Sequence, residues 1–186
     1  EALVAAPMLD EDYDGPILLG PIAAAQLLAS TVAVHAGGEP APLSDYGRLL
    51  ELEPHWHEKL GSGVLPDFLD LVDDPLVDGF GRYVRDAEGF PAQRLELVRT
   101  GKLHTLLMTR RPNDHIGESN GHARGTPSLA IASSISNLTL SSRKPGWDQR
   151  RLERDLLRRA REDGYEHAYV IEVLRDPTVL GSVPRD

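Results

Sequence analysis

The sequence predicts an α+β fold, mainly an antiparallel β-sheet with one buried helix and one amphipathic helix. Three observations lead to this class. Short β-prone segments separated by tight-turn residues follow one another between residues 64 and 140. A nearly uninterrupted apolar stretch covers residues 22–36, and a segment with helical periodicity covers residues 149–163. Strands grouped apart from the helices are typical of α+β proteins.

The central strand meander is predicted from side-chain alternation and turn chemistry. Leu95 and Leu97 alternate with charged residues across residues 92–99, which is the period of a strand. The segments Asp86–Gly89 and Thr100–Gly101 each contain a glycine that can supply the positive φ of a tight turn. The predicted strands of this part are 64–72, 82–85, 92–99 and 103–108, followed by one or two strands within 128–140.

The flanking segments supply the helices. Residues 22–36 are apolar on almost every side, so we expect a buried helix that starts at Pro21 and ends at Gly37. Residues 149–163 place leucines at helical spacing after Asp148, a predicted N-cap, and Gly164 ends this helix. The predicted flanking strands are 2–8, 16–19 and 165–174.

Composition limits the classes of function. The 186 residues include 29 acidic and 20 basic side chains, and a net charge of −9 argues against binding a nucleic acid, whose phosphates are neutralised by Lys and Arg. No apolar stretch is long enough to span a membrane, so we expect no membrane partner and a cytoplasmic location. Without cysteine, disulfides and thiolate zinc ligands are excluded. The length fits a single domain, 1–186, with parts at 1–36, 64–140 and 148–174.

Four pieces of the sequence, taken in order, resemble the TldD/PmbA family of metalloproteases and their paralogous subunits. They are Val64-Leu-Pro-Asp-Phe-Leu69 with Val72-Asp-Asp-Pro75, Asp86-Ala-Glu-Gly89, Leu97-Val-Arg-Thr-Gly-Lys-Leu103, and Ser119-Asn-Gly-His-Ala-Arg124. Each piece alone is common turn chemistry, whereas four in one order over about sixty residues are hard to reach by chance. The resemblance extends in weaker form from Gly15 to about Val173. Because family members are usually more than twice as long, we expect this chain to be a fragment.

The resemblance has a consequence for catalysis. In catalytic members of the family, the segment that resembles Gly15–Leu28 leads into a zinc-binding HExxxH. The matching positions here read Ala29-Ser-Thr-Val-Ala-Val34, which offer neither an imidazole ligand nor a carboxylate base. A further ligand of the family is a cysteine, and this chain has none. The chain therefore resembles the non-catalytic TldE-like type, and we expect no catalytic residue, metal or cofactor in it.

The resemblance also implies the partners of such a chain. They are a peptide substrate and a homologous subunit, in a hetero- or homodimer whose zinc, where there is one, lies in the catalytic subunit. An extended peptide could then bind by adding a strand to a sheet edge, since this mode uses main-chain groups.

The loop 110–125 is longer than a hairpin requires, and long loops in compact domains are often functional. Positions that correspond to Ser119, Asn120, Gly121 and His122 lie near the peptide cleft of related proteins, so these four are the predicted substrate-binding residues. We expect His122 to join a loop carbonyl to a substrate main-chain group, and His122→Ala to weaken peptide processing with little change in melting temperature. The alternative is an Ω-loop satisfied by its own side chains.

Two other functions stay open. One is a zinc hydrolase with a relocated site, made of His104, His115 and His122 with Glu118 as the base. The other is a purely structural interaction module. A metal titration separates the relocated zinc site from the other two hypotheses, since only that site requires this chain to bind zinc. Mass measurement in solution separates a lone module from a subunit.

A cluster of aspartates lies between residues 67 and 74. Asp67 and Asp70 are three residues apart, so in a strand they fall on opposite faces and cannot converge on a metal. We therefore expect turn and edge roles for Asp67, Asp70, Asp73 and Asp74.

Overall fold

A computed structural model describes residues 12–39, 56–126 and 129–174, so the predicted strand at 2–8 lies outside the described residues. The chain divides into two compact units. The first consists of Glu1–Gln26 and Trp147–Asp176, and the second of Leu27–Gly146 and Pro177–Asp186. No helix in the described residues is long and apolar enough to cross a membrane.

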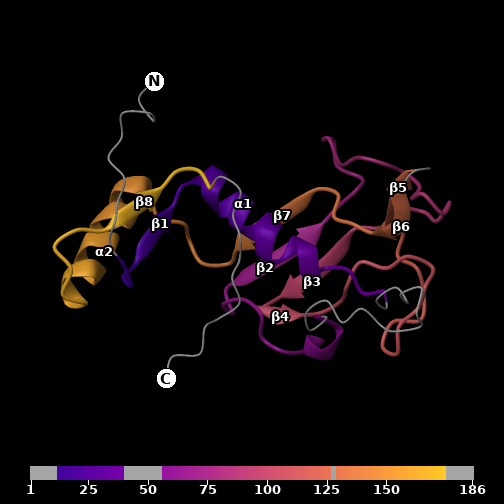
Figure 1. Cartoon of the computed structure of the whole chain (residues 1–186), viewed down its shortest axis with the longest axis horizontal. Coiled ribbons are helices and arrows are strands. Elements are labelled where there is room, and N and C mark those ends of the chain that lie inside the picture. Colours follow the sequence, from indigo (N-terminus) through magenta and orange to yellow (C-terminus); the bar gives the residue numbers. More distant parts are fainter. Residues whose placement is uncertain (1–11, 40–55, 127–128, 175–186) are drawn as a thin grey trace. The chain divides into compact units, whose positions relative to one another are not determined.

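The first unit pairs two short strands from distant parts of the sequence. β1 (Ile17–Leu19) and β8 (Tyr169–Ile171) are parallel, with Ile17 opposite Tyr169. The helix α2 (Gln149–Glu162) lies beside β1 (Figure 1). The ring of Tyr13 lies 4.7 Å from the rings of both Tyr165 and Tyr169, centroid to centroid, at the separation of stabilising aromatic pairs.

The helix α2 forms as its sequence predicts, because its ends are defined locally. The side chain of Asp148 accepts a hydrogen bond from the Arg151 amide at 2.7 Å, which satisfies one of the free N–H groups at the helix start. Leu156 and Ala160, one turn apart, are the buried positions. Gly164 follows the helix with φ of 87°, a left-handed conformation that suits glycine.

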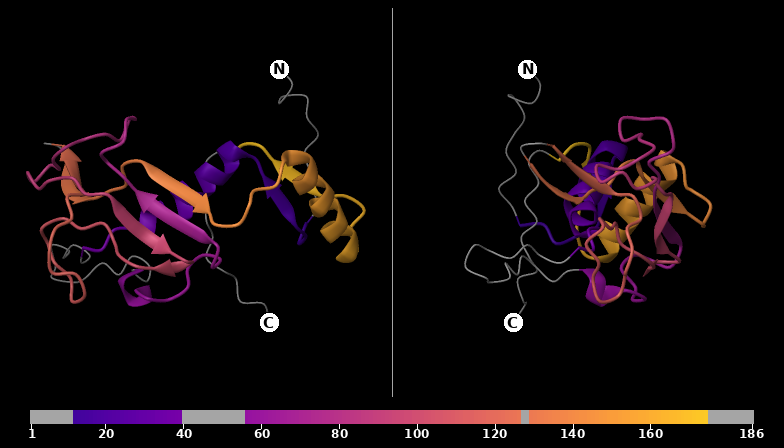
Figure 2. Two further views of the ribbon diagram at one scale, coloured as in Figure 1. Left: turned by 180° about the vertical axis from the view of Figure 1, so that it is seen from behind. Right: turned by 90° about the vertical axis from the view of Figure 1, so that its right-hand side faces the viewer.

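The second unit contains a four-stranded antiparallel sheet in the order β4-β3-β2-β7. Its strands are β4 (Lys102–Leu103), β3 (Leu95–Arg99), β2 (Leu69–Asp73) and β7 (Leu138–Ser142). β5 (Ala123–Thr126) and β6 (Leu129–Ser133) pair with each other outside this sheet (Figure 2). This meander and its turns confirm the predicted fold class, with β6 and β7 as the two strands expected near 128–140.

The core of the second unit lies on one face of the sheet. Leu71 and Leu97 point to this face, while Asp70 and Glu96 alternate with them toward the other face. A short stripe of helical residues covers the core, with Val32 and Ala36 buried and Leu28 partly buried. The remaining buried members of the core are Val98, Leu103, Leu106 and Leu107.

The predicted buried helix at 22–36 is shorter and more exposed than expected. α1 covers Pro21–Thr31, and a 3-10 turn at Ala33–His35 follows, so the helix ends before Gly37. Ile22 is 60% exposed, and Ala23 is the buried residue of the helix. The Thr31 hydroxyl donates to the Leu27 carbonyl at 2.7 Å, a local bond that competes with helix continuation. The prediction of burial was wrong because an apolar composition gives no buried face by itself.

Several predicted strands are also absent or shortened. β2 begins at Leu69 and not at residue 64, and β8 covers only three residues of the predicted 165–174. Residues 82–85 form no strand and contribute only a bridge between Arg85 and Pro91. β4 covers two residues, although Leu106, Leu107 and Met108 beyond it are fully buried. The backbone of this buried segment is satisfied elsewhere, since the Leu107 amide donates to Ala36 and the Leu107 carbonyl accepts from Gly38. Residues 106–108 are therefore fully buried without being part of a strand, so the burial predicted for them was correct and the strand was not.

Candidate functional site

The segment from Met108 to Arg124 closes on a buried polar centre formed by Asn120 and His122. The Asn120 side-chain oxygen accepts from the Met108 amide at 2.8 Å, and its nitrogen donates to the Leu106 carbonyl at 2.7 Å. Both ends of the loop are thereby fixed to the core by one amide side chain. His122 is completely buried beside it.

The imidazole of His122 lies between the loop and the sheet. Its Nε2 is 3.1 Å from Oδ2 of Asp73, the last residue of β2, and its Nδ1 is 3.0 Å from the Asn120 carbonyl. Asp73 is also fully buried. Both ring nitrogens face oxygen atoms of the protein, and the Nε2 contact connects the loop to the sheet. This contact joins positions 49 residues apart in the sequence.

Ser136 completes the centre, but the three side chains do not form a catalytic triad. The Ser136 hydroxyl donates to Oδ2 of Asp73 at 2.6 Å, and its amide donates to the same carboxylate at 3.0 Å. In a triad the histidine contacts the serine and the carboxylate orients the histidine. Here the carboxylate is in the middle, so no base activates the serine. The arrangement fixes three segments to one another.

The turn at Asp86–Gly89 clamps the same loop from a second side. The Asp86 carboxylate accepts from the amides of Glu88 and Phe90 within the turn, and from the amide of Ala123 at 3.1 Å. Glu88 forms an ion pair with Arg110 at 3.2 Å. Asp86 and Glu88 therefore connect the turn to both ends of the loop, and this explains the two acidic positions of the Asp86-Ala-Glu-Gly89 piece.

Tyr83 contacts the loop at its tightest point. Its hydroxyl donates to the Gly121 carbonyl at 2.8 Å, and its ring meets the His122 ring edge to face. The Arg124 guanidinium lies 4.6 Å from the centre of the Tyr83 ring. Burial is the largest cause that raises the pKa of Tyr83, and the negative charges of Asp73 and Asp86 raise it further. The positive charge of Arg124 lowers it, and the net result is a pKa of about 12. The phenol therefore stays neutral and can donate its hydrogen bond to the Gly121 carbonyl.

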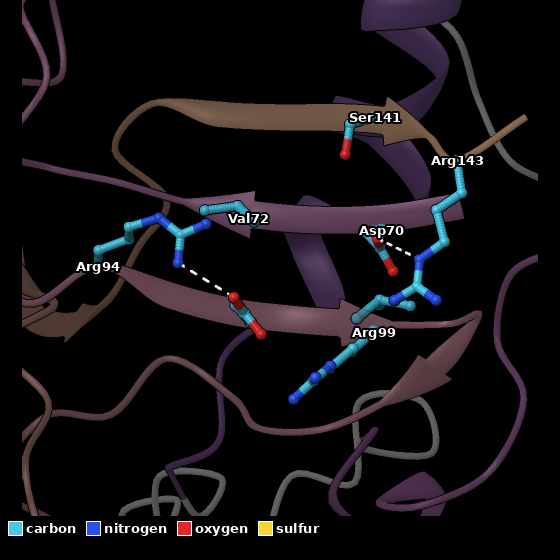
Figure 3. A pocket seen from close by; sticks show the side chains of 8 residues that line it. Asp70, Val72, Arg94, Arg99, Ser141 and Arg143 are labelled. Atoms are coloured by element: carbon cyan, nitrogen blue, oxygen red, sulfur yellow. Dashed lines mark hydrogen bonds and ion pairs between the residues drawn. The ribbon is translucent and has the colours of Figure 1, made fainter. Parts of the chain in front are cut away.

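A pocket of about 320 Å³ opens on the face of the sheet that carries Asp70 and Glu96, and the core residue Val98 also contributes to its lining (Figure 3). Its lining residues come from β2, β3, β7 and the residues next to them: Asp70, Val72, Arg94, Glu96, Val98, Arg99, Ser141 and Arg143. Arg143 Nε is 2.7 Å from Asp70, and Arg94 is 3.2 Å from Glu96. Sequence alternation places Arg94 and Glu96 on one face, but the pairing of β2 with β7, which brings in Arg143, has no local signal.

Residues 13–165 match the family described as the PmbA/TldA metallopeptidase C-terminal domain. The chain belongs to this family. The match covers most of the sequence and includes both the loop centre and the pocket. It confirms the resemblance to TldD/PmbA proteins that the four sequence pieces indicate.

Individual relatives agree with the family. A protein called Metalloprotease from Methanothermobacter thermautotrophicus is 42% identical over 67 residues, which are 36% of this chain and 15% of that protein. The crystal structure of TldE from Thermococcus kodakarensis matches with a TM-score of 0.61 and 18% identity, over 88% of this chain and 33% of that one. A protein from Thermotoga maritima, titled as a proposed modulator of a DNA gyrase, matches with a TM-score of 0.53 and 20% identity, over 76% and 30%.

These comparisons define what this PmbA/TldA-family chain shares with its relatives. At 18% and 20% identity, the two structural matches show the fold alone. The chain spans about one third of the length of those two structures and less of the metalloprotease. Activity, substrates and partners of a whole family protein are therefore proposals for this chain.

The four predicted substrate-binding residues of this family member lie together, on one tight segment. Asn120 and His122 have buried side chains, and both His122 ring nitrogens contact the protein's own oxygens. The Ser119 hydroxyl accepts from the Gly121 amide at 3.2 Å, and Gly121 has φ of 75°. One nitrogen of His122 thus contacts a loop carbonyl, while the other contacts Asp73, where a substrate main-chain group was expected. The assignment of the segment to a peptide cleft stays a prediction.

The relocated zinc site is not assembled. His104, His115 and Glu118 are exposed, whereas His122 is buried against Asp73. Among the described residues, no group of three or more His, Cys, Asp or Glu side chains could hold a metal ion. The hypothesis of a zinc hydrolase built on these residues was wrong, because the pairing of His122 with Asp73 withdraws it from the loop surface.

The segment that matches the family's zinc motif does not fit a metal either. Ser30 and Thr31 both donate their hydroxyl protons to the Leu27 carbonyl. His35, just beyond the segment, stacks on Trp56 with 6.1 Å between ring centroids. Ala29–Val34 therefore presents neither a ligand set nor a base.

The roles expected for the aspartates are partly corrected. Asp74 acts in the turn, since it accepts from the Leu76 amide at 2.9 Å. Asp73 was expected at a turn or an edge and is instead the buried partner of His122 and Ser136. Its partners are distant in the sequence, and an aspartate before Asp74-Pro75 reads as turn chemistry without them.

Proposed function

We propose that this chain is the C-terminal part of a TldE-like, non-catalytic subunit. In this proposal it shapes a peptide-binding cleft beside a zinc-bearing homologous subunit, in the cytoplasm, and the complex cleaves or matures peptides. The family match supports the metallopeptidase setting. The observation that carries the peptide-binding role is the open edge of the sheet at β7.

Among the strands that the structure describes, β7 is an edge strand, paired with β2 on one side only. The Asp74 amide donates to the Asn137 carbonyl at 3.2 Å, and the Arg143 amide donates to the Phe68 carbonyl at 2.8 Å. Bonded pairs alternate in an antiparallel ladder, so Thr139 and Ser141 bond β2 while the amides of Leu138, Leu140 and Ser142 face outward. Three amides at every second residue are the pattern that an added peptide strand requires.

The segment Ser119–His122 is connected to the first residue of β7 through Asp73. Leu138, the first residue of β7, is paired with Asp73, and Asp73 holds His122. The clamps from Asp73, Asp86 and Tyr83 fix the Ser119–His122 segment, so its backbone is ordered before a ligand arrives. In the proposal, Ser119 and Gly121 border the cleft, while Asn120 and His122 act as positioning residues behind it.

The non-catalytic part of the proposal rests on residues 29–34. A subunit that supplies no zinc ligand there needs a partner that does, and a homologous subunit with an intact HExxxH meets this requirement. We expect purified protein of this sequence to bind no stoichiometric zinc after incubation and dialysis, by elemental analysis. One tightly held zinc per chain would contradict the non-catalytic assignment.

The decisive test uses the full-length protein together with a zinc-motif paralogue. We expect the pair to co-purify and to cleave a peptide that neither cleaves alone. Leu140→Pro removes one outward amide but no ladder bond, because proline is tolerated where an edge N–H faces solvent. Thr139→Pro, one residue away, removes a ladder bond and serves as the matched folding control. Peptide capture that survives Leu140→Pro unchanged, in a folded complex, would refute the role of the β7 edge.

A further inference from the structure

The pocket on the open face of the sheet gathers three arginines from three different places. Arg94 precedes β3, Arg99 ends it, and Arg143 follows β7 (Figure 3). Asp70 and Glu96 are the acidic residues of the same pocket. Counted over the lining residues alone, three arginines and two carboxylates leave one excess positive charge in a chain whose net charge is −9. Local charge of this sign, opposite to that of the whole molecule, attracts an anion.

Two of the arginines are held by carboxylates and one is not. Asp70 accepts from Arg143 Nε at 2.7 Å and from the Thr100 amide at 2.6 Å. The Arg143 hydrogen bond, followed by the Thr100 amide, lowers the pKa of Asp70, which keeps the carboxylate charged and Arg143 in place. Arg94 pairs with Glu96 and Asp74. The Arg99 guanidinium makes no hydrogen bond or ion pair with any residue that the structure describes, and the side chain is exposed at the pocket wall.

The position of the pocket relates it to the β7 edge. Ser141 lies on β7 and lines the pocket, and Arg143 continues the same face two residues later. Side chains of a strand alternate between faces, so every second residue of a peptide added along β7 would point to this face. Neighbouring strands lie about 4.8 Å apart, so a side chain opposite Ser141 lies close to Arg143. Arg99 on β3 is separated from the added strand by β7 and β2, so only a long side chain of the peptide reaches its guanidinium.

We propose that this arginine pocket, formed by the eight lining residues, binds a carboxylate of the peptide that adds to β7. The inference rests on the proposed function and specifies which peptides it favours. Arg99 supplies the free guanidinium, whose planar N–H fork suits a carboxylate, and Arg143 is held nearby by Asp70. A single negative charge matches the excess charge of the pocket. A phosphate dianion matches it less well, because Asp70 and Glu96 repel the second charge.

Fluorescence anisotropy with the full-length protein tests the proposal. Three labelled extended peptides share one sequence: the first has Glu at a central position and a C-terminal amide, the second has Gln and an amide, and the third has Gln and a free carboxylate. We expect the first or the third to bind about tenfold more tightly than the second, as for a charge-assisted hydrogen bond. Their order identifies a side chain or the C-terminus as the source of the carboxylate.

Variants separate the pocket from general charge attraction. Arg99→Gln should abolish the preference for the carboxylate and leave the affinity for the neutral peptide unchanged. Arg150→Gln on the exposed side of α2 removes the same charge and should change neither value. Acetate should compete with the acidic peptide more effectively than inorganic phosphate at equal ionic strength, and the reverse order would overturn the carboxylate assignment.

Failure of the pocket and failure of the proposed function give different results. Equal binding of all three peptides, lost in Leu140→Pro, would overturn the arginine pocket and support the β7 edge. No binding of any peptide would overturn both. A preference that persists in Arg99→Gln would overturn the assignment to this pocket.

Discussion

Asp73 is the buried carboxylate that joins the loop, through His122, to β2 and to Ser136. It is fully buried and accepts hydrogen bonds from His122 and Ser136. In Asp73→Asn, the new NH2 group faces the N–H and O–H groups of Ser136 or the His122 ring, so one of these hydrogen bonds is lost. The His122 imidazole also loses its contact with a carboxylate. We expect a loss of about 3 kcal/mol in the free energy of unfolding, as when a buried pair is broken. Chemical denaturation of the two proteins measures it.

The matched control for this change is Asp78→Asn. Asp78 is almost fully exposed and pairs only with Arg82 among the residues described, so its replacement should leave stability nearly unchanged. Equal denaturation midpoints for the Asp73 and Asp78 variants would show that the buried pair contributes nothing measurable.

The burial of His122 also changes the expectation for its replacement. From the sequence, His122→Ala was expected to leave the melting temperature nearly unchanged. Removal of a side chain that lies between Asp73 and Asn120 takes a hydrogen-bond partner from two buried residues and leaves a cavity. We now expect a clear loss of stability, and a smaller one in the Asp73→Asn background, since the two residues are coupled.

Tyr83 predicts a pH dependence at alkaline pH. Its pKa is raised from 10.0 to about 12, mainly by burial, so the folded state favours the neutral phenol. The resulting stabilisation is complete below pH 10 and is lost as the pH rises toward 12. Wild-type protein should therefore lose more stability than Tyr83→Phe over this interval. Parallel losses, or a tyrosinate absorbance difference between the two that titrates near pH 10, would contradict the assignment.

Among the elements, the two turns of the loop region allow a paired test of glycine. Gly121 and Gly89 both have positive φ, 75° and 86°. A Cβ at Gly121 would meet the Pro91 carbonyl oxygen at 2.1 Å, whereas a Cβ at Gly89 would meet nothing within 4 Å. We expect Gly89→Ala to cost about 1–2 kcal/mol from backbone strain. Gly121→Ala should cost about 1–3 kcal/mol more, because the backbone must move.

Thermal unfolding of both glycine variants gives the difference directly. The backbone conformation is common to the two positions, so the difference isolates the approach of Gly121 to Pro91. If Gly121→Ala were no less stable than Gly89→Ala, the loop would not be packed as tightly as described.

The elements that the sequence predicted well are those with local signals. α2 has its N-cap at Asp148 and its stop at Gly164, both within one turn of its ends. The turns at Gly89 and Gly101 likewise depend on a few neighbouring residues. The apolar stretch 22–36 had no such signal for its buried face. Its burial depends on which residues reach the core, and the stripe from Leu28 to Ala36 does so.

The candidate site was predictable only in part, for the same reason. The loop was found from its length and from its likeness to a family, and Ser119 to His122 indeed form one tight segment. The pairing of His122 with Asp73 depends on where a loop returns to a strand 49 residues earlier. The arginine pocket likewise depends on the pairing of β2 with β7, which no local pattern specifies.

On the scale of the whole molecule, exposed apolar side chains gather in the segment between β2 and β3. Phe80 is fully exposed, and Leu76, Val77, Val84 and Phe90 are exposed as well. Exposed apolar side chains in such number favour association where they adjoin one another. We expect this chain to self-associate at high concentration and Phe80→Ser to reduce the association at unchanged stability, by light scattering. A clean monomer at high concentration would contradict this expectation.

The division into two units has a consequence for the order of folding. β1 and β8 are paired strands, and the whole second unit up to Gly146 lies between them in the sequence. Their pairing closes a loop of about 150 residues, and closure entropy grows with loop length. During synthesis β1 cannot pair until β8 has been made, near the end of the described chain. β2 and β3 can pair much earlier, because few residues separate them in the sequence. Prior folding of the second unit would shorten the effective loop, so the first unit is expected to form late.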